Sequence, residues 1–189
     1  MTRDKLFNLM RAKGHVIFED DSKPYNLNLI GVRSNDKNPD TFNDELNILW
    51  KHRGKWCHLV FTMTTDPGMY YLKDPINVDG TIIMVPGQYG GAYKNGLHKG
   101  KPALEQKNPM RYWRDYNRDE VLDTGGEIYK SVAKTNLHHA GKDSTFVGKW
   151  SAGCQVVANR DEFDFIMYLT FKAEKYWGNS FTYTLIDEG

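Results

Sequence analysis

The pattern of apolar positions predicts a short helix at the start of the chain. Thr2 is a residue type that caps helices, and Gly14 is one that ends them. Between these two residues, one helical face is apolar and holds Leu6, Leu9 and Met10. A helix between Thr2 and Gly14 is therefore expected.

Short apolar or alternating runs, separated by turn residues, predict several strands. These runs cover residues 15–18, 27–32, 45–50, 57–63, 81–85 and 181–186. Asp66, Pro67 and Gly68 favour a tight reversal after the fourth run. The stretch from 86 to 109 is rich in Gly, Lys and Tyr and has no helical period. We interpret it as a set of short strands rather than as a long binding or lid loop.

The clearest helix covers residues 160–177. Asn159 is a suitable N-cap, acidic residues occupy the first turn, and Gly178 ends the segment. Apolar residues follow helical spacing at Phe163, Ile166 and Met167. Because no repeat, linker or low-complexity tract interrupts the chain, residues 1–189 are expected to form a single domain. Its expected class is β-rich α+β, with a short N-terminal helix and a C-terminal-region helix.

Composition narrows the classes of partner. Lys and Arg number 25 against 24 Asp and Glu, so the net charge of +1 gives no reason to expect nucleic acid or an anionic membrane. No run of eighteen apolar residues occurs, and the charged N-terminus does not resemble a signal peptide. We therefore expect synthesis in the cytoplasm and no membrane insertion. Aromatic residues make up 13% of the chain, which suits either a peptide- or sugar-binding groove or a large core.

The chain has two cysteines, Cys57 and Cys154. Two are too few for a disulfide framework or a zinc site made of cysteines alone, although one disulfide between them stays open. A free cysteine is more often a buried, inert residue than a nucleophile. The surroundings of Cys154 nevertheless suit chemistry, because Gly153 gives a substrate carbonyl access to the backbone and Ser151 can hold a substrate group or tie the loop.

A base for this thiol is available in residues 135–140, which have strand character. On a strand, His138 and His139 point to opposite faces, so only one of them can face Cys154. Asn136 shares a face with His138 and can orient its imidazole, or a backbone carbonyl can do so. The residues thus suggest a Cys154–His138 pair, which depends on the two being close in space.

Other residues offer alternatives and additional contacts. A zinc hydrolase would use His98, His138 or His139, and Cys154 or an aspartate, but no recognised metal-ligand spacing supports it. We accordingly expect no metal and no cofactor. His98 lies in a basic Gly-flanked loop, and either it is an exposed loop histidine, which is the preferred interpretation, or it binds substrate or closes over the thiol site. The aromatic residues near these segments that can contact substrate are Tyr89, Tyr93 and Trp150. Separately, residues 115, 117 and 119 have the spacing of a calcium loop, although a solvated turn is the preferred interpretation.

The stretch around Cys154 resembles the L,D-transpeptidase catalytic domain, a β-rich cysteine-enzyme family that acts on peptidoglycan stem peptides. The family signature is a histidine at a strand end, a loop, and then Ser/Thr-His-Gly-Cys. Here His138 is followed by twelve residues and then by Ser151-Ala152-Gly153-Cys154. The resemblance covers residues 137–159. It implies a β-sandwich or barrel fold and no metal.

The resemblance also implies roles for individual residues. Cys154 would be the nucleophile and His138 the base, and the carbonyl of His139 would orient the imidazole. Backbone N–H groups around Gly153 and Cys154 would form the oxyanion hole, and Ser151 matches the hydroxyl position of the family.

Two positions depart from the family pattern. Ala152 stands where the family has histidine, and Val156 stands where it usually has arginine. The second departure removes an expected contact to a substrate carboxylate, so another cation would have to replace it. The candidates by charge are Lys99, Lys101, Arg111 and Arg114.

A looser likeness extends along the chain through "TTDPG", "PGQY", "GLHKG", "RDYNRDE" and "WSAGCQV". Together these segments look like a branch of this fold that bacteriophages and prophages often carry. This implies an endolysin-like role in lysis or cell-wall entry, with delivery to the wall by a phage lysis system, and it favours hydrolysis over transpeptidation. A non-catalytic wall-binding or virion module on the same fold is the alternative, motivated by Ala152 and Val156.

Overall fold

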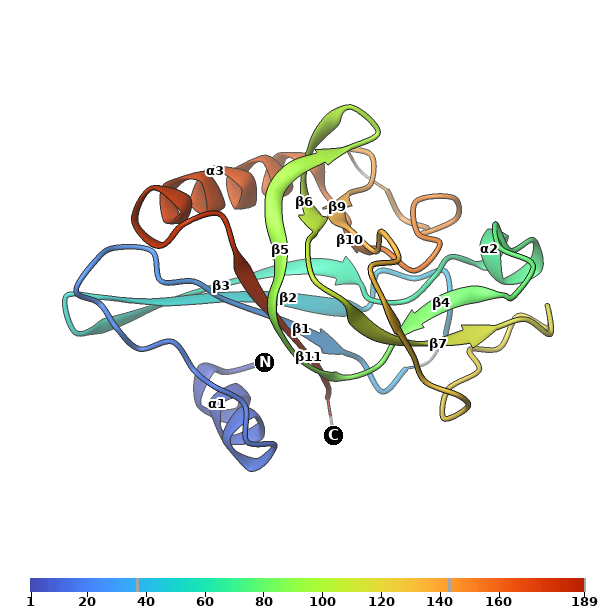
Figure 1. Ribbon diagram of the computed structural model, residues 1–189, viewed down its shortest axis with the longest axis horizontal. Coiled ribbons are helices and arrows are strands. Elements are labelled where there is room, and N and C mark those ends of the chain that lie inside the picture. The colour runs from blue at the N-terminus through green and yellow to red at the C-terminus, as the bar shows by residue number, and fades with distance from the viewer. Residues whose placement is uncertain (37, 143, 189) are drawn as a thin grey trace.

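The computed structural model describes residues 1–36, 38–142 and 144–188, and its centre is a closed mixed β-barrel (Figure 1). Within the described residues, eight strands close in the order β1-β11-β5-β6-β9-β10-β3-β2. The pairs β1–β11 and β9–β10 are parallel, and the other neighbours are antiparallel. The strands are β1 Asn28–Arg33, β2 Asp44–His52, β3 Lys55–Thr64, β5 Gly87–His98, β6 Lys101–Gln106, β9 Leu137–His139, β10 Gln155–Val157 and β11 Phe181–Asp187.

A small antiparallel sheet lies beside one end of the barrel (Figure 1). Its order is β4-β7-β8, with β4 at Thr81–Met84, β7 at Met110–Asp115 and β8 at Tyr129–Ser131. The sheet is joined to the barrel along the chain, because β4 is followed by β5 and β6 is followed by β7. It therefore places its side chains next to the end of the barrel where β9 and β10 lie.

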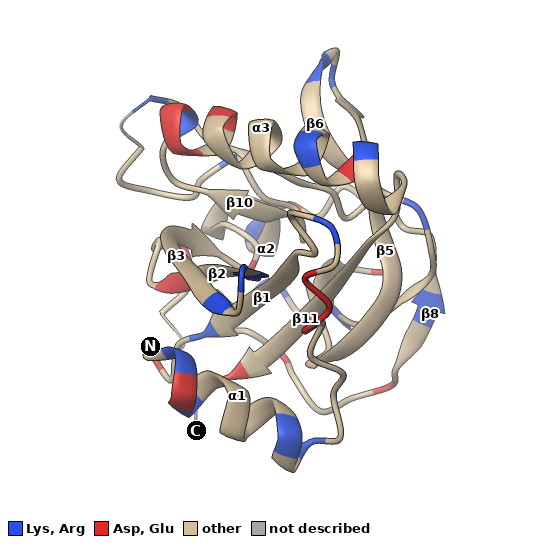
Figure 2. Cartoon of the chain, turned by 90° about the vertical axis from the view of Figure 1, so that its left-hand side faces the viewer, with Lys and Arg blue, Asp and Glu red and all other residues tan. Residues whose placement is uncertain are grey.

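Helices lie on the outside of the barrel, at α1 Arg3–Ala12, α2 Met69–Lys73 and α3 Arg160–Trp177. Figure 2 shows α3 and α1 on opposite sides of the strands, with basic and acidic segments interspersed. The expected caps are present, because the Thr2 side chain accepts from Lys5 N and Asn159 accepts from two N–H groups of the first turn. The β-rich α+β class with both terminal-region helices is confirmed, and α2 was not predicted.

Two local predictions were wrong. Residues 15–18 form no strand, because the N–H and C=O of Val16 bond to the side-chain amide of Gln88 rather than to a neighbouring strand. Residues 87–106 form one long hairpin, β5–β6, instead of several short strands. Its turn uses Lys99 and Gly100, both with positive φ, as a tight two-residue hairpin requires.

A buried polar network fixes the strand that follows Cys154. Tyr183 Oη donates to Gln155 Oε1 at 2.8 Å, and Gln155 Nε2 donates to the Thr65 carbonyl at 3.3 Å. Arg33 Nε donates to Thr65 Oγ1 at 3.0 Å, which extends the network to β1. Because buried polar groups without partners are costly, this network holds β10 in one position inside the barrel.

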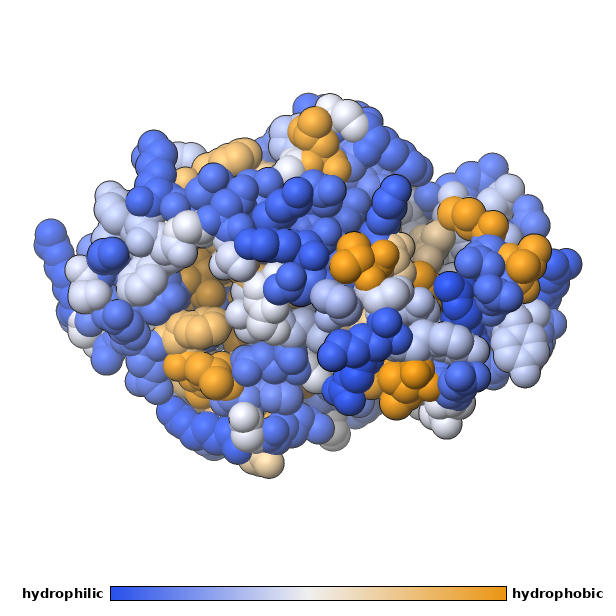
Figure 3. Space-filling model, viewed as in Figure 1, coloured by the Kyte–Doolittle hydropathy of each residue, from blue (hydrophilic) through white to orange (hydrophobic). Residues whose placement is uncertain are grey.

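In the described part of the chain, no helix combines the length and the apolar character needed to cross a bilayer. Figure 3 shows a largely hydrophilic face with small, separate hydrophobic patches, several of them on the side of the small sheet.

Candidate active site

Parallel pairing of β9 and β10 brings His138 and Cys154 together. In the register of these strands, Val156 lies opposite His138, and Gln155 N donates to the Asn136 carbonyl at 2.9 Å. Cys154 is the residue before β10, so its side chain lies at the end of the strand beside His138. The loop between the strands returns the chain to the same end of the barrel, which is what a parallel pair needs.

His138 is buried, and one nitrogen of its ring is held by the backbone. Its Nδ1 donates to the His139 carbonyl at 2.9 Å, as the family resemblance implied, and this leaves the lone pair on Nε2. Nε2 is buried and has no hydrogen-bond partner among the described residues. Burial lowers the pKa of His138 to about 4, against the opposing effect of the His139 carbonyl, so the ring is neutral at pH 7.

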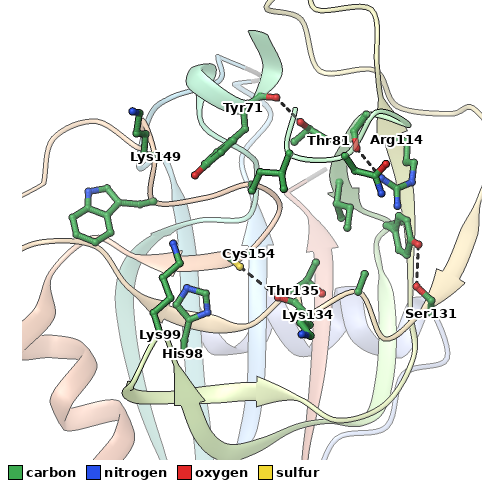
Figure 4. Close-up of a pocket in the computed structure, with 18 residues that line it drawn as sticks. Tyr71, Thr81, His98, Lys99, Arg114, Ser131, Lys134, Thr135, Lys149 and Cys154 are labelled. Atoms are coloured by element: carbon green, nitrogen blue, oxygen red, sulfur yellow. Dashed lines mark hydrogen bonds between the residues drawn. The ribbon is translucent and has the colours of Figure 1, made fainter. Parts of the chain in front are cut away.

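Cys154 is a free thiol on the wall of a cavity. Its Sγ lies 3.8 Å from the Lys134 carbonyl oxygen (Figure 4). Burial of the sulfur raises the pKa of the thiol to about 11, although the Asn136 N–H and the charge of Lys99 favour the thiolate. Cys57 is also a free thiol, so the two cysteines form no disulfide.

The gap between the two groups is small. The sulfur of Cys154 and a ring nitrogen of His138 lie within 4.8 Å of each other, and no hydrogen bond joins them in the described structure. This is slightly beyond hydrogen-bond reach. In unliganded enzymes, catalytic contacts are often longer than they are in the substrate complex.

The loop before Cys154 is fixed by Ser151. Ser151 Oγ donates to the Cys154 carbonyl at 2.8 Å and accepts from Gly153 N at 3.1 Å. The expected oxyanion role of the Gly153 N–H is therefore wrong for this arrangement, because that N–H already has a partner. The Cys154 N–H makes no hydrogen bond among the described residues, so it is the backbone donor that stays available.

Gly153 is required at its position for two reasons. Its φ is +113°, in a region that side chains disfavour, and an added Cβ would lie 2.7 Å from Cβ and from the carbonyl oxygen of Ile82. The loop is thus packed directly against β4 of the small sheet.

His98, from the end of β5, stacks on His138. The ring centroids are 4.2 Å apart and the planes differ by 4°. Asn136 Nδ2 lies 3.0 Å from His98 Nδ1, while Asn136 Oδ1 accepts from Gln106 N at 2.9 Å. The idea that Asn136 orients His138 is therefore wrong. Asn136 instead holds His98, and since its oxygen is occupied it presents its N–H to that ring.

A cavity of about 490 Å³ opens in front of the thiol (Figure 4). Its walls come from the small sheet, the hairpin tip and the loops at 71–82, 131–135 and 149–154. The charged residues that line it are all basic, and no Asp or Glu occurs among the described lining residues: Lys99, Arg114, Lys134 and Lys149. In Figure 4, Arg114 and Ser131 lie on one side of Cys154, and Lys99 and Lys149 lie on the other.

The structure places only two of the four predicted substrate-binding residues at the cavity. His98 and the half-exposed Trp150 line the cavity. Tyr89 and Tyr93 do not, and this prediction was wrong, because both side chains point into the barrel core. The hydroxyl of Tyr89 donates to the Val85 carbonyl, and Tyr93 is fully buried with its ring against Tyr183.

Of the four basic residues that are candidates by charge to replace the missing arginine, Lys99 and Arg114 line this cavity. Arg111 bonds instead to the Pro86 carbonyl, and Lys101 lines a smaller neighbouring cavity. The cavity also uses residues that the sequence did not indicate, among them Lys149 and the loop at 76–82.

His98, His138 and Cys154 place three potential metal ligands within 4.8 Å of one another. A metal ion binds an imidazole along its lone pair, in the plane of the ring. The two rings are stacked almost parallel, so no ion position lies in the planes of both rings. His98 would therefore have to turn, and give up its contact with Asn136, before it could bind the same ion as His138. The side chains as arranged therefore do not fit a shared metal.

Comparison with known proteins adds no assignment. No family model matches the chain, and neither the curated proteins nor the solved structures give a match.

Proposed function

We propose that this chain is an L,D-transpeptidase-like cysteine enzyme that cleaves or exchanges an amide bond in peptidoglycan stem peptides. The observation that carries the proposal is His138, whose Nε2 is buried and without a hydrogen-bond partner and whose ring has a nitrogen within 4.8 Å of the Cys154 sulfur, beside an open cavity. The mixed barrel and the Ser151-Ala152-Gly153-Cys154 motif support the family likeness.

The reaction would run through a thioester. Cys154 Sγ attacks the amide carbon while its proton moves to His138 Nε2, and the tetrahedral oxygen receives a hydrogen bond from the Cys154 N–H. Collapse breaks the C–N bond, and the leaving amine takes the proton from His138. Water or an acceptor amine then attacks the thioester and loses its proton to His138, which returns it to the sulfur. Hydrolysis is the outcome that a phage lysis role favours.

Charge in the cavity supports an anionic peptide as the acyl donor. The Arg114 guanidinium is positioned by a 2.7 Å hydrogen bond to the Gly80 carbonyl and lies over the rings of Tyr112 and Tyr129. Among the described residues it forms no ion pair. A fixed guanidinium without a protein carboxylate is suited to a carboxylate of the substrate, and stem peptides carry such groups.

The first experiment uses purified cell walls. Cys154→Ala is expected to abolish release of stem-peptide fragments, whereas Cys57→Ala, which removes the other thiol, should retain it. Mass spectrometry of quenched reactions should detect an acyl adduct on Cys154. Products with new carboxyl ends identify water as the acceptor, and new cross-links identify an amine. Unchanged activity of Cys154→Ala would end the proposal.

A second experiment tests the substrate charge. Arg114→Gln should lower kcat/KM for a peptide with a free carboxylate by roughly tenfold to a hundredfold, as loss of a charge-assisted hydrogen bond does. It should have little effect on the corresponding peptide amide. Arg111→Gln, on the same strand but outside the cavity, is the matched control. An equal loss for both peptides would mean that Arg114 only shapes the wall.

The non-catalytic module remains the second candidate because the resting sulfur is not hydrogen-bonded to His138 and burial raises its pKa. Such a module would bind cell walls with the same affinity in the native and Cys154→Ala forms. It would release no fragments and form no adduct.

A further inference from the structure

The outward face of α3 is aromatic, although a helix face in contact with water is normally polar. Four large side chains on this helix are 45–49% exposed: Phe165, Tyr168, Phe171 and Tyr176. The rings of Phe165 and Tyr168 are nearly parallel, with centroids 6.1 Å apart and planes that differ by 13°. Because an aromatic side chain offers about 200 Å², the four present roughly 400 Å² of surface per chain. Exposed apolar surface of this extent commonly marks an interaction site.

The charges on the same face of α3 are separated along the helix. Residues spaced by three and four positions share one stripe of a helix. On α3 one such stripe contains Asp161, Asp164, Phe165, Tyr168, Phe171, Lys172 and Lys175. Figure 2 shows acidic bands gathered toward one end of α3 and basic bands toward the other. At 1.5 Å per residue Asp161 and Lys175 lie about 21 Å apart, so they cannot pair within one chain.

Few of these charges have a partner. Among the described residues, Asp161 and Lys175 form no ion pair, and Asp164 has one exposed contact, with Arg160 at 3.8 Å. The Lys172 ammonium lies over the ring of Tyr168, 5.1 Å from its centroid. The stripe therefore offers an acidic end, an aromatic middle and a basic end, all open to a partner.

The order of the residues in the stripe is self-complementary about Tyr168. Residues at equal distances before and after it match as follows: Phe165 with Phe171, Asp164 with Lys172, and Asp161 with Lys175. When two identical helices pack antiparallel about a two-fold axis, residues at equal distances from the axis on opposite sides lie at the same level. The acidic end of each helix then meets the basic end of the other, and the helix dipoles oppose each other favourably. Parallel packing would instead bring like charges together.

We propose that two copies of this chain associate through α3, packed antiparallel with the two-fold axis near Tyr168. The aromatic surface of both copies and the flanking charged side chains together give an interface of roughly 1,000 Å², which is at the lower end for a specific complex. The dimer is therefore weak, with a Kd on the order of 10–100 µM. No residue of α3 is among the described residues that line the cavity at Cys154, so this association does not depend on the proposed function.

Sedimentation equilibrium of the full-length chain measures the association, at concentrations from about 1 to 500 µM. The average molar mass should rise from that of the monomer toward twice that value. Tyr168→Glu places two carboxylates at the two-fold axis and should weaken association by at least tenfold. Its Tm should stay close to that of the native chain, because this side chain is half-exposed. Tyr116→Glu, at an exposed tyrosine outside α3, is the matched control and should associate like the native chain.

Charge reversal tests the antiparallel orientation. The double variant Asp161→Lys/Asp164→Lys makes both ends of the stripe basic, and Lys172→Asp/Lys175→Asp makes both ends acidic. Each alone should associate at least tenfold more weakly than the native chain, because like charges then meet. An equimolar mixture of the two should associate with about the native affinity, since every opposite-charge match is restored. Glu162→Lys, in the same helical turn but outside the stripe, is the control and should change the affinity less than twofold.

Three results would overturn the proposal. The first is a chain that stays monomeric up to about 500 µM. The second is unchanged association of Tyr168→Glu, and the third is a mixture of the charge-reversed variants that associates no better than either alone. A monomer that binds a chitin oligosaccharide, and loses this binding in Phe165→Ala, would identify the face as a sugar platform and would likewise reject the dimer.

Discussion

The protonation state of the Cys154–His138 pair can be predicted from its surroundings. The pKa of Cys154 rises from 9.0 to about 11, and that of His138 falls from 6.5 to about 4. Moving the proton from sulfur to nitrogen then costs about 9 kcal/mol at 1.36 kcal/mol per pKa unit. Attraction between the two charges, within 4.8 Å at an effective dielectric constant of about 20, returns about 3 kcal/mol. The neutral pair is therefore favoured by roughly 10⁴.

This balance predicts slow labelling of Cys154 in the free protein. At pH 7 the Cys154 thiolate should be roughly a hundredfold rarer than that of a thiol with a pKa of 9.0. The rate of iodoacetamide labelling should rise tenfold per pH unit up to about pH 11. It should change little in His138→Ala, because the neutral imidazole does not stabilise a resting thiolate.

The assay follows Cys154 alkylation by mass spectrometry in a Cys57→Ser background from pH 5 to pH 11. A pH-independent rate between pH 5 and pH 8 that disappears in His138→Ala would show a thiolate–imidazolium pair and refute the reasoning. Slow labelling alone does not separate enzyme from binding module, since both have a protonated thiol at rest. Turnover separates them, because His138→Ala should lower it by about 10²–10⁴ if His138 is the base.

Three further outcomes are expected. Gly153→Ala should destabilise the fold by roughly 2–4 kcal/mol in denaturant titrations, because its Cβ would meet Ile82 and φ is +113°. Tyr183→Phe should cost about 1–3 kcal/mol, since Gln155 Oε1 loses its buried donor. The pKa of His138 is lower in the folded than in the unfolded chain, so the unfolded state binds more protons as pH falls. Between pH 7 and pH 5 the free energy of unfolding should therefore fall by about 2 kcal/mol. His138→Gln should not show this fall.

Helices and strands were predicted correctly where a sequence signal, such as a helix cap or an apolar run, was compatible with only one kind of element. The caps at Thr2 and Asn159 placed two helices, and the apolar run in 27–32 placed β1. The β5–β6 hairpin was not recognised, because Gly90, Gly91 and Gly96 interrupt its alternation. Those glycines weaken the periodicity without preventing the strand, since neighbouring strands on both sides supply hydrogen bonds to its backbone.

Contacts across the barrel were the part that the sequence could not supply. The period-2 pattern tells which residues share a face but not which face is the core, so Tyr89 and Tyr93 were assigned to a groove although they face inward. The partner of Asn136 depended in the same way on long-range pairing. Asn136 reaches His98 only because β6 lies between β5 and β9 in the barrel.

Ala152 and Val156, the two positions that depart from the motif that the sequence resembles, have a physical interpretation in this barrel. Val156 is fully buried, opposite His138 and Thr64 on the neighbouring strands, so an arginine there would be desolvated within the barrel wall and would not reach the cavity. The cations that do line the cavity come from other elements, Arg114 from β7 and Lys99 from the hairpin turn. Ala152 likewise leaves space on the cavity wall, and the imidazole beside the thiol is supplied by His98. Under the proposed function, we therefore interpret both substitutions as a relocation of groups to other segments.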